Sequence, residues 1–371
     1  MSVELPSRRT AMAVSLLSLA MLTPAFAGSL DADLVDRLGA AQSARLQVLS
    51  TLDTQQLQES LRALESLKSL KSLESLKAFG ALSAYDSFDG FDTSDDSPGT
   101  IGSNQPIDEH RPLNADGRLR ISNVAGSVDV SAWNKNEVAV TGELGAGSEK
   151  LDISGDASNL AVVVKLPRKS HNVADSELRL RVPIGAHVEI ETVSADVSAH
   201  DLAGPVKVNT VSGDVSLQLA SPEVSVQTVS GDLTLHAPSH QTRVNTVSGD
   251  LNLSGLQDRL SAETVSGDLE LDGGRFSDLH LKSISGDMRV AVSFAQDAQV
   301  NGETLSGNIT LSVPAGLSGS ALLKSFSGDT LFEGAQTVAS SKKHEFVFGN
   351  GNGGVHFELS SFSGDIRVEK K

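Results

Sequence analysis

Eight aspartates recur at the fifth position of a short repeated phrase, T-V-S-G-D-L, and a regular row of carboxylates is a candidate binding site for hard cations. The row consists of Asp196, Asp214, Asp232, Asp250, Asp268, Asp287, Asp329 and Asp365, with Asn308 at the same position of one further copy. If neighbouring copies lie about 4.8 Å apart, adjacent carboxylates repel by about 0.9 kcal/mol in water. Another interaction must therefore offset this repulsion.

Two interpretations of the aspartate row are open. In the first, each aspartate accepts a hydrogen bond from a backbone N–H or a serine hydroxyl at a turn, and no cofactor is needed. In the second, the row holds Ca²⁺, because calcium prefers clustered carboxylate oxygens. The calcium-binding nonapeptide G-G-x-G-x-D is absent from the sequence, which favours the first interpretation. The candidate calcium ligands are Asp214, Asp232, Asp250, Asp268 and Asp287.

No other group of residues in the sequence predicts catalysis. The chain has nine histidines, of which only His236 and His240 share a four-residue spacing, and Pro238 between them argues against a helix. Neither the H-E-x-x-H motif of zinc proteases nor the G-x-S-x-G motif of serine hydrolases occurs. We therefore expect a protein that is not an enzyme, with a polysaccharide-active β-helix enzyme as the less favoured alternative.

The repeated phrase predicts the architecture that positions the aspartates. Five copies begin at Thr192, Thr210, Thr228, Thr246 and Thr264, and looser copies begin at Ser283, Thr304, Ser325 and Ser361. The first five are 18 residues apart, a length too short to enclose a hydrophobic core alone, so each copy must be one coil of a stack. We expect an all-β fold, a single-stranded β-solenoid or β-helix of about 18-residue coils, preceded by an α-helical segment.

Alternation of apolar and polar residues predicts which side chains face inward. It places the second residue of the motif (Val193 in the first copy) and the glycine inside, and the serine and aspartate outside. The pattern Val124-x-Gly-x-Val-x-Val130 predicts a degenerate coil well before Thr192. The 36-residue interval between Ser325 and Ser361 equals two periods and predicts a coil without the motif.

Four segments are expected along the chain. Residues 1–27 combine Arg8 and Arg9 with an apolar stretch and the small-x-small sequence Ala25-Phe-Ala27, as cleaved secretory signals do. Residues 28–82 are rich in leucine and predict a helical segment that could form a homo-oligomer. Residues 83–106 predict an acidic, disordered linker, and residues 107–371 the β-solenoid.

Composition narrows the partners and the compartment. The net charge of −17 disfavours nucleic acid and anionic lipid as partners. The chain has no cysteine, which excludes disulfides, thiolate metal sites and a lipoprotein anchor. After signal cleavage we expect no stable membrane insertion, and we expect the protein in the periplasm or at the cell surface, with an unidentified protein or glycan of the envelope as its partner.

Several motifs are shared with a known family. They are Leu119-Arg-Ile121, Gly126-Ser-Val-Asp-Val130 with Trp133, Leu178-Arg-Leu-Arg-Val-Pro-Ile-Gly185 and the T-V-S-G-D coils. On these residues the region from about Leu119 to Lys371 resembles the bacterial putative-adhesin domain family of unknown function. The resemblance implies an exported β-solenoid in the cell envelope, sometimes linked to envelope stress, and no catalytic residues. We expect this solenoid to be a scaffold for adhesion or interaction. A self-assembling structural solenoid is the alternative.

Overall fold

The computed structural model describes residues 104–166, 174–333, 335–337, 344–349 and 354–371, and every regular element among them is a β-strand. The all-β prediction is therefore confirmed for these residues. The expected signal, the leucine-rich segment and nearly all of the expected linker lie outside the described residues, and the first strand begins at Gln105. Among the described residues no helix is long and apolar enough to span a membrane.

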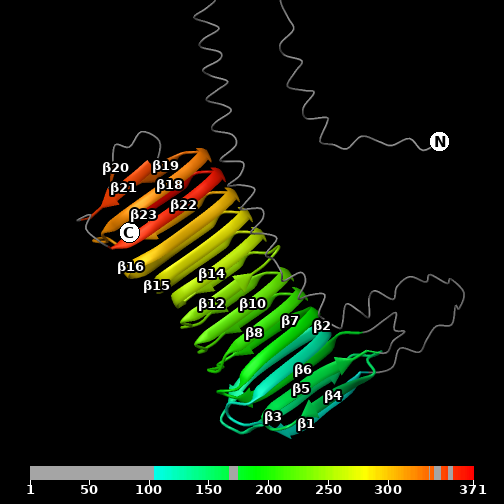
Figure 1. Ribbon diagram of the computed structural model, residues 1–371. Helices are drawn as coiled ribbons and strands as arrows, with labels where there is room; N and C mark the ends of the chain where they lie inside the picture. The colour runs from blue at the N-terminus through cyan, green and yellow to red at the C-terminus, as the bar shows by residue number, and fades with distance from the viewer. Residues whose placement is uncertain (1–103, 167–173, 334, 338–343, 350–353) are drawn as a thin grey trace, which may run out of the picture. The chain divides into compact units, whose positions relative to one another are not determined.

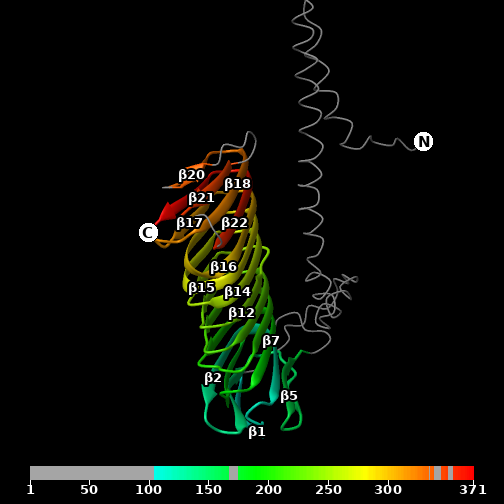
Figure 2. The ribbon, with the colours of Figure 1, turned by 60° about the vertical axis from the view of Figure 1, so that its left-hand side comes forward.

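The central repeats form two walls of parallel strands, in which each strand pairs with the strand 18 residues further along the chain (Figure 1). One wall contains β8 (Val206–Ser212), β10 (Glu223–Ser230), β12 (Gln241–Asn245) and β14 (Gln257–Ser266). The other contains β9 (Val215–Gln218), β11 (Leu233–His236) and β13 (Leu251–Ser254). The long strands β7 (His187–His200), β15 (Leu269–Ser285) and β16 (Met288–Ser306) contribute to both walls. Figure 2 shows the stacked coils from a second side.

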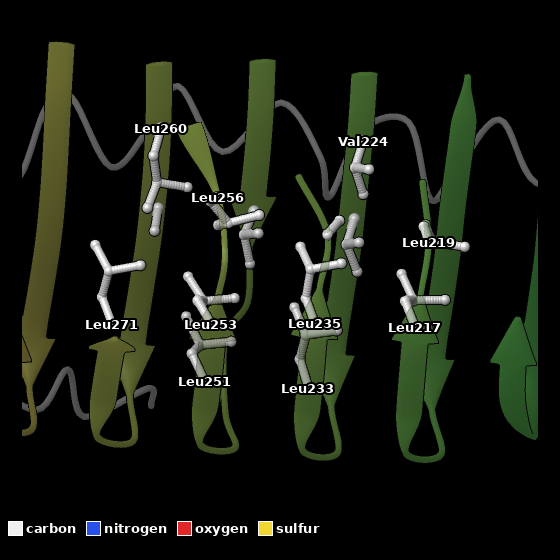
Figure 3. Close-up of a cluster of buried hydrophobic side chains, with 14 of the residues drawn as sticks. Leu217, Leu219, Val224, Leu233, Leu235, Leu251, Leu253, Leu256, Leu260 and Leu271 are labelled. Carbon is white, nitrogen blue, oxygen red and sulfur yellow. The ribbon is translucent and has the colours of Figure 1, made fainter. Parts of the chain in front are cut away.

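Aliphatic side chains from both walls fill the space between them (Figure 3). Leu217, Leu235 and Leu253 come from one wall and meet Val224 and Leu260 from the other, and all five are almost completely buried. Because each coil contributes the same positions, the leucines stack on their counterparts in the next coil. A continuous hydrophobic core results, although no single coil could enclose one.

The motif forms the corner between the two walls, and here the expected burial of its valine is wrong. The alternation runs unbroken through Val226 and Thr228, so the threonine is buried and Val229 lies on the outer face, partly exposed. A polar threonine is tolerated inside because its hydroxyl donates to the carbonyl of Ser230, 3.2 Å away. The change of phase falls at the Ser-Gly step, two residues later than expected.

Glycine at the corner is required by two features of the backbone. Gly249 has a φ of +117°, a backbone conformation that residues other than glycine rarely adopt. An added Cβ would also lie 2.2 Å from the carbonyl oxygen of Gly231 in the preceding coil. The corners are therefore stacked too closely for a side chain at this position.

At the amino-terminal end, antiparallel strands cover the stack. The strands here are β1 (Gln105–Pro112), β2 (Arg118–Trp133), β3 (Glu137–Leu144), β4 (Lys150–Gly155), β5 (Asn159–Lys165) and β6 (Ser176–Pro183). Strand β2 pairs in parallel with β7 on one side and with β5 and β6 on the other, so it is the degenerate coil predicted around Val124. The antiparallel pairs β4–β5, β3–β6 and β1–β3 complete this end.

At the carboxy-terminal end, the order of the coils in space differs from their order in the chain. The strands are β17 (Ile309–Val313), β18 (Gly319–Ser327), β19 (Thr330–Phe332), β20 (Gln336–Thr337), β21 (His344–Phe348), β22 (Val355–Ser363) and β23 (Ile366–Lys370). Strand β22 lies between β16 and β18. The last copy of the motif in the chain, at Ser361, is therefore stacked between the copies at Thr304 and Ser325. The expectation of an extra coil in the 36-residue interval is wrong. Strands β20 and β21 of this interval pair antiparallel with each other, and β21 pairs antiparallel with β18, at the end of the stack.

Candidate binding surface at the repeat corner

The aspartate column, defined as the eight repeat aspartates with Asn308, forms a continuous series of hydrogen bonds along the corner. In every residue of the column except Asp329, the last of the series, the side-chain Oδ1 accepts the backbone N–H of the equivalent residue in the next coil, at 2.8–3.0 Å. The series runs from Asp196 to Asp329 in the order of the stack, and Asn308 accepts the N–H of Asp365 in the same way. The expected hydrogen bonds from backbone N–H groups to the aspartates are thus confirmed.

The five calcium candidates lie in this column but do not converge on one point. These residues are Asp214, Asp232, Asp250, Asp268 and Asp287, and each uses its Oδ1 as a hydrogen-bond acceptor. Within the described ranges, no three histidine, aspartate or glutamate side chains come together as metal ligands would. The arrangement therefore suits coil-to-coil hydrogen bonding better than cation coordination.

A basic partner of the aspartate column escaped the sequence analysis. The guanidinium of Arg289 lies 3.3 Å from Oδ2 of Asp268 and 3.4 Å from Oδ2 of Asp287, so it bridges two adjacent coils. These are the oxygens that the coil-to-coil hydrogen bonds leave available. The signal was present in the sequence, because Arg289 is two residues after Asp287 and therefore on the same face of the strand.

The second residues of the motif form an apolar column on the outer side of the same corner. In the order of the stack the apolar column is Val124, Val193, Val211, Val229, Val247, Val265, Ile284, Leu305, Phe362 and Phe326. The side chains become larger along the stack, and the last three are exposed by 37% for Leu305, 44% for Phe362 and 59% for Phe326. The two phenylalanine rings are stacked, with centroids 4.8 Å apart and planes inclined by 9°.

The sizes of these side chains could not have revealed the column from the sequence. Inward positions also change in size between adjacent coils, since Val300 pairs with Phe357 and Gly302 with Leu359 and all four are buried. The exposure of Leu305, Phe362 and Phe326 in the structure is what distinguishes the apolar column.

A shallow cavity lies at the turns that connect successive coils. It has a volume of about 460 Å³ and is lined by Pro205, Pro222, Glu223, His240, Gln241, Asp258, Arg259 and Ser277. Nδ1 of His240 is 2.6 Å from Oδ2 of Asp258, but the hydroxyl of Ser277 donates to the backbone carbonyl of Asp258 and not to the imidazole. This geometry lacks the hydroxyl–imidazole contact of a nucleophilic triad.

The two histidines with four-residue spacing have separate partners. His236 forms a hydrogen bond through Nδ1 with the hydroxyl of Ser254 at 3.0 Å, whereas His240 pairs with Asp258. Each ring is therefore held by a residue of the next coil, 18 residues along the chain, and the pair does not form a common ligand set.

Comparison with known proteins gives one family and several solved structures. The sequence profile of the Toastrack DUF4097 family matches residues 122–369. Among curated proteins no match was found. The crystal structure of a putative adhesin from Bacteroides fragilis is 10% identical, with 72% of this chain and 98% of that chain covered and a TM-score of 0.37. A putative adhesin from Parabacteroides merdae is 14% identical, with 72% and 96% covered and a TM-score of 0.32.

Proposed function

The chain belongs to the Toastrack DUF4097 family, and from this premise we propose that it is a non-enzymatic protein of the bacterial cell envelope whose coils form a scaffold for binding a partner. The 18-residue register between paired strands supports its description as a single-stranded β-solenoid. Antiparallel strands at both ends of the stack disfavour the alternative of end-to-end self-assembly.

The apolar column is the observation that carries this proposal. Leu305, Phe362 and Phe326 remain between one third and two thirds exposed in the folded protein. Their partial burial therefore contributes only part of the stabilising free energy that full burial of such side chains would provide. A contiguous set of large apolar side chains on a soluble surface is typical of an interaction site. We propose a protein as the partner, because Leu305, Phe362 and Phe326 present a contiguous apolar surface.

Export and assembly are further parts of the proposal. The signal-like residues 1–27 support export to the periplasm or the cell surface, and the leucine-rich residues 28–82 support homo-oligomer formation. Neither a cofactor nor nucleic acid is required. A role in an envelope-stress response is consistent with a scaffold that binds another envelope protein.

Site-specific photo-crosslinking in cells tests the proposal. A photoreactive phenylalanine analogue is placed at Phe326, at Phe362, or at Ile184 as a control, which is 47% exposed but belongs to neither column. We expect the same protein to be cross-linked from position 326 and from position 362. The cross-link from either position should be lost when the phenylalanine at the other position is replaced by serine. No cross-link from either position, or an equal yield from Ile184, would contradict the proposal.

A further inference from the structure

Resting on the proposed function, we infer that the partner contributes a basic amphipathic helix that lies along the corner. Its apolar face would contact Leu305, Phe362 and Phe326, and its lysine or arginine side chains would pair with the neighbouring aspartates. Three observations lead to this class of partner: the charge beside the apolar column, the spacing of its side chains, and the hydrogen bonds that already occupy the corner backbone.

The aspartate column beside the apolar column is negative, although Arg367 lies at the same repeat position as Arg289, two residues after Asp365. Asp365 and Asp329 are three residues after Phe362 and Phe326, and both are exposed. The Oδ1 of Asp365 is used for the next coil, which leaves its Oδ2 for another donor. Arg289, bridging Oδ2 of two adjacent coils, is an example within this molecule of a cation bound in that way. A partner with cationic side chains therefore complements this surface.

The spacing of the column favours a helix that runs along the stack. Adjacent strands lie about 4.8 Å apart, so the apolar column presents a side chain at this interval. Residues three and four apart in an α-helix rise by about 4.5 and 6 Å, which brings one apolar side chain to nearly every coil. Phe362 and Phe326 provide the largest contact area at the end of this row.

The backbone at the corner excludes the addition of a strand. The N–H of Gly307 donates to Ser363 at 3.0 Å and that of Gly364 to Ser327 at 3.1 Å, so successive corners already pair with one another. A strand laid beside them would find these groups occupied. A side-chain contact, as a helix makes, remains available.

Two other occupants are disfavoured by charge. A second copy would bring its own aspartate column against this one, and like charges facing each other repel. An anionic membrane would be repelled by the same column and by the net charge of −17. A basic partner helix avoids both penalties.

Titration with designed peptides tests this inference. Three 18-residue peptides are used: an amphipathic Leu-Ala-Lys helix, the same helix with Glu in place of Lys, and a peptide of the first composition whose leucines are spread around the helix. Fluorescence anisotropy with the full mature chain should give binding of the first peptide at least about tenfold tighter than that of the others. This affinity should fall with added salt.

Two protein variants separate the apolar contribution from the charged one. The double substitution Phe326→Ser and Phe362→Ser should weaken binding about tenfold or more. Asp329→Asn with Asp365→Asn should weaken it about three- to tenfold and reduce its salt dependence. Asn308 shows that an amide keeps the coil-to-coil hydrogen bond, so the second variant should fold normally.

The outcomes distinguish this inference from the proposed function. Equal binding of the three peptides, or no effect of either variant, would overturn the helix, and cross-linking of a native partner from Phe326 would then leave the proposed function intact. Discriminating peptide binding without any cross-link in cells would support the surface chemistry and contradict the proposed cellular role.

Discussion

Replacing Asp250 by Ala or by Asn separates the hydrogen-bonding role of the aspartate column from its charge. Oδ1 of Asp250 accepts the N–H of Asp268 at 2.9 Å, and a hydrogen bond to a charged group contributes about 2 kcal/mol. Repulsion from two neighbouring carboxylates opposes it by about 0.5 kcal/mol each at physiological salt. Asp250→Ala removes both effects and should destabilise the protein by about 1 kcal/mol, whereas Asp250→Asn keeps a neutral bond of about 1 kcal/mol and should be nearly neutral.

Thermal unfolding followed by circular dichroism checks these values. For a domain of this size, 1 kcal/mol corresponds to a melting temperature about 2–4 °C lower. In 1 M salt the repulsion falls to about 0.2 kcal/mol per neighbour, so both variants should become less stable relative to wild type by about 0.6 kcal/mol, and the difference between Ala and Asn should remain. If Asn were as destabilising as Ala, the carboxylate would act through its charge, and the hydrogen-bonding account of the column would be wrong.

Three further predictions concern the corner, the metal and assembly. Gly249→Ala should lower the free energy of unfolding by about 3 kcal/mol or more, because of the positive φ and the nearby carbonyl of Gly231. The control Ala195→Gly should lower it by less than about 1 kcal/mol. Equal melting temperatures of the two variants would refute the steric reasoning. Millimolar Ca²⁺ should leave the melting temperature unchanged, and an increase would show that the aspartate column binds the ion. Deleting residues 28–82 should reduce the mass measured by light scattering to that of a monomer; an unchanged oligomer would exclude this segment as its cause.

Much of the fold could be predicted from the spacing of the motif. A fixed interval of 18 residues with alternating apolar positions requires stacked coils, and it placed Asp250 outside and Gly249 at a tight corner, as observed. The order of the coils could not be predicted, because periodicity gives the length of a coil and not its neighbour. Strand β22 therefore lies between β16 and β18 without any local signal.

The candidate surface was missed for a different reason. The valine of the motif was expected inside, but Thr228 continues the buried row, satisfies its hydroxyl through Ser230 and leaves Val229 on the outer face. The hydrogen bond from the Thr228 hydroxyl to the Ser230 carbonyl depends on the backbone geometry of the corner, which the sequence alone does not give. The increase in size from Val265 to Phe326 was visible in the sequence, but buried positions such as Val300 and Phe357 differ as much, so size did not identify the exposed face.

The central claim is that the apolar column binds a partner and is not needed for folding. The most direct measurement is the yield of cross-linked partner from a photoreactive residue at Leu305, compared between wild type and the Phe326→Ser, Phe362→Ser variant, with the melting temperature of each. We expect the cross-link to disappear while the melting temperature falls by no more than about 10 °C, since stacking of the two rings contributes about 1 kcal/mol and the partial burial of each ring about 1 kcal/mol more. An undiminished cross-link together with a much larger loss of stability would show that the column serves the fold and not a partner.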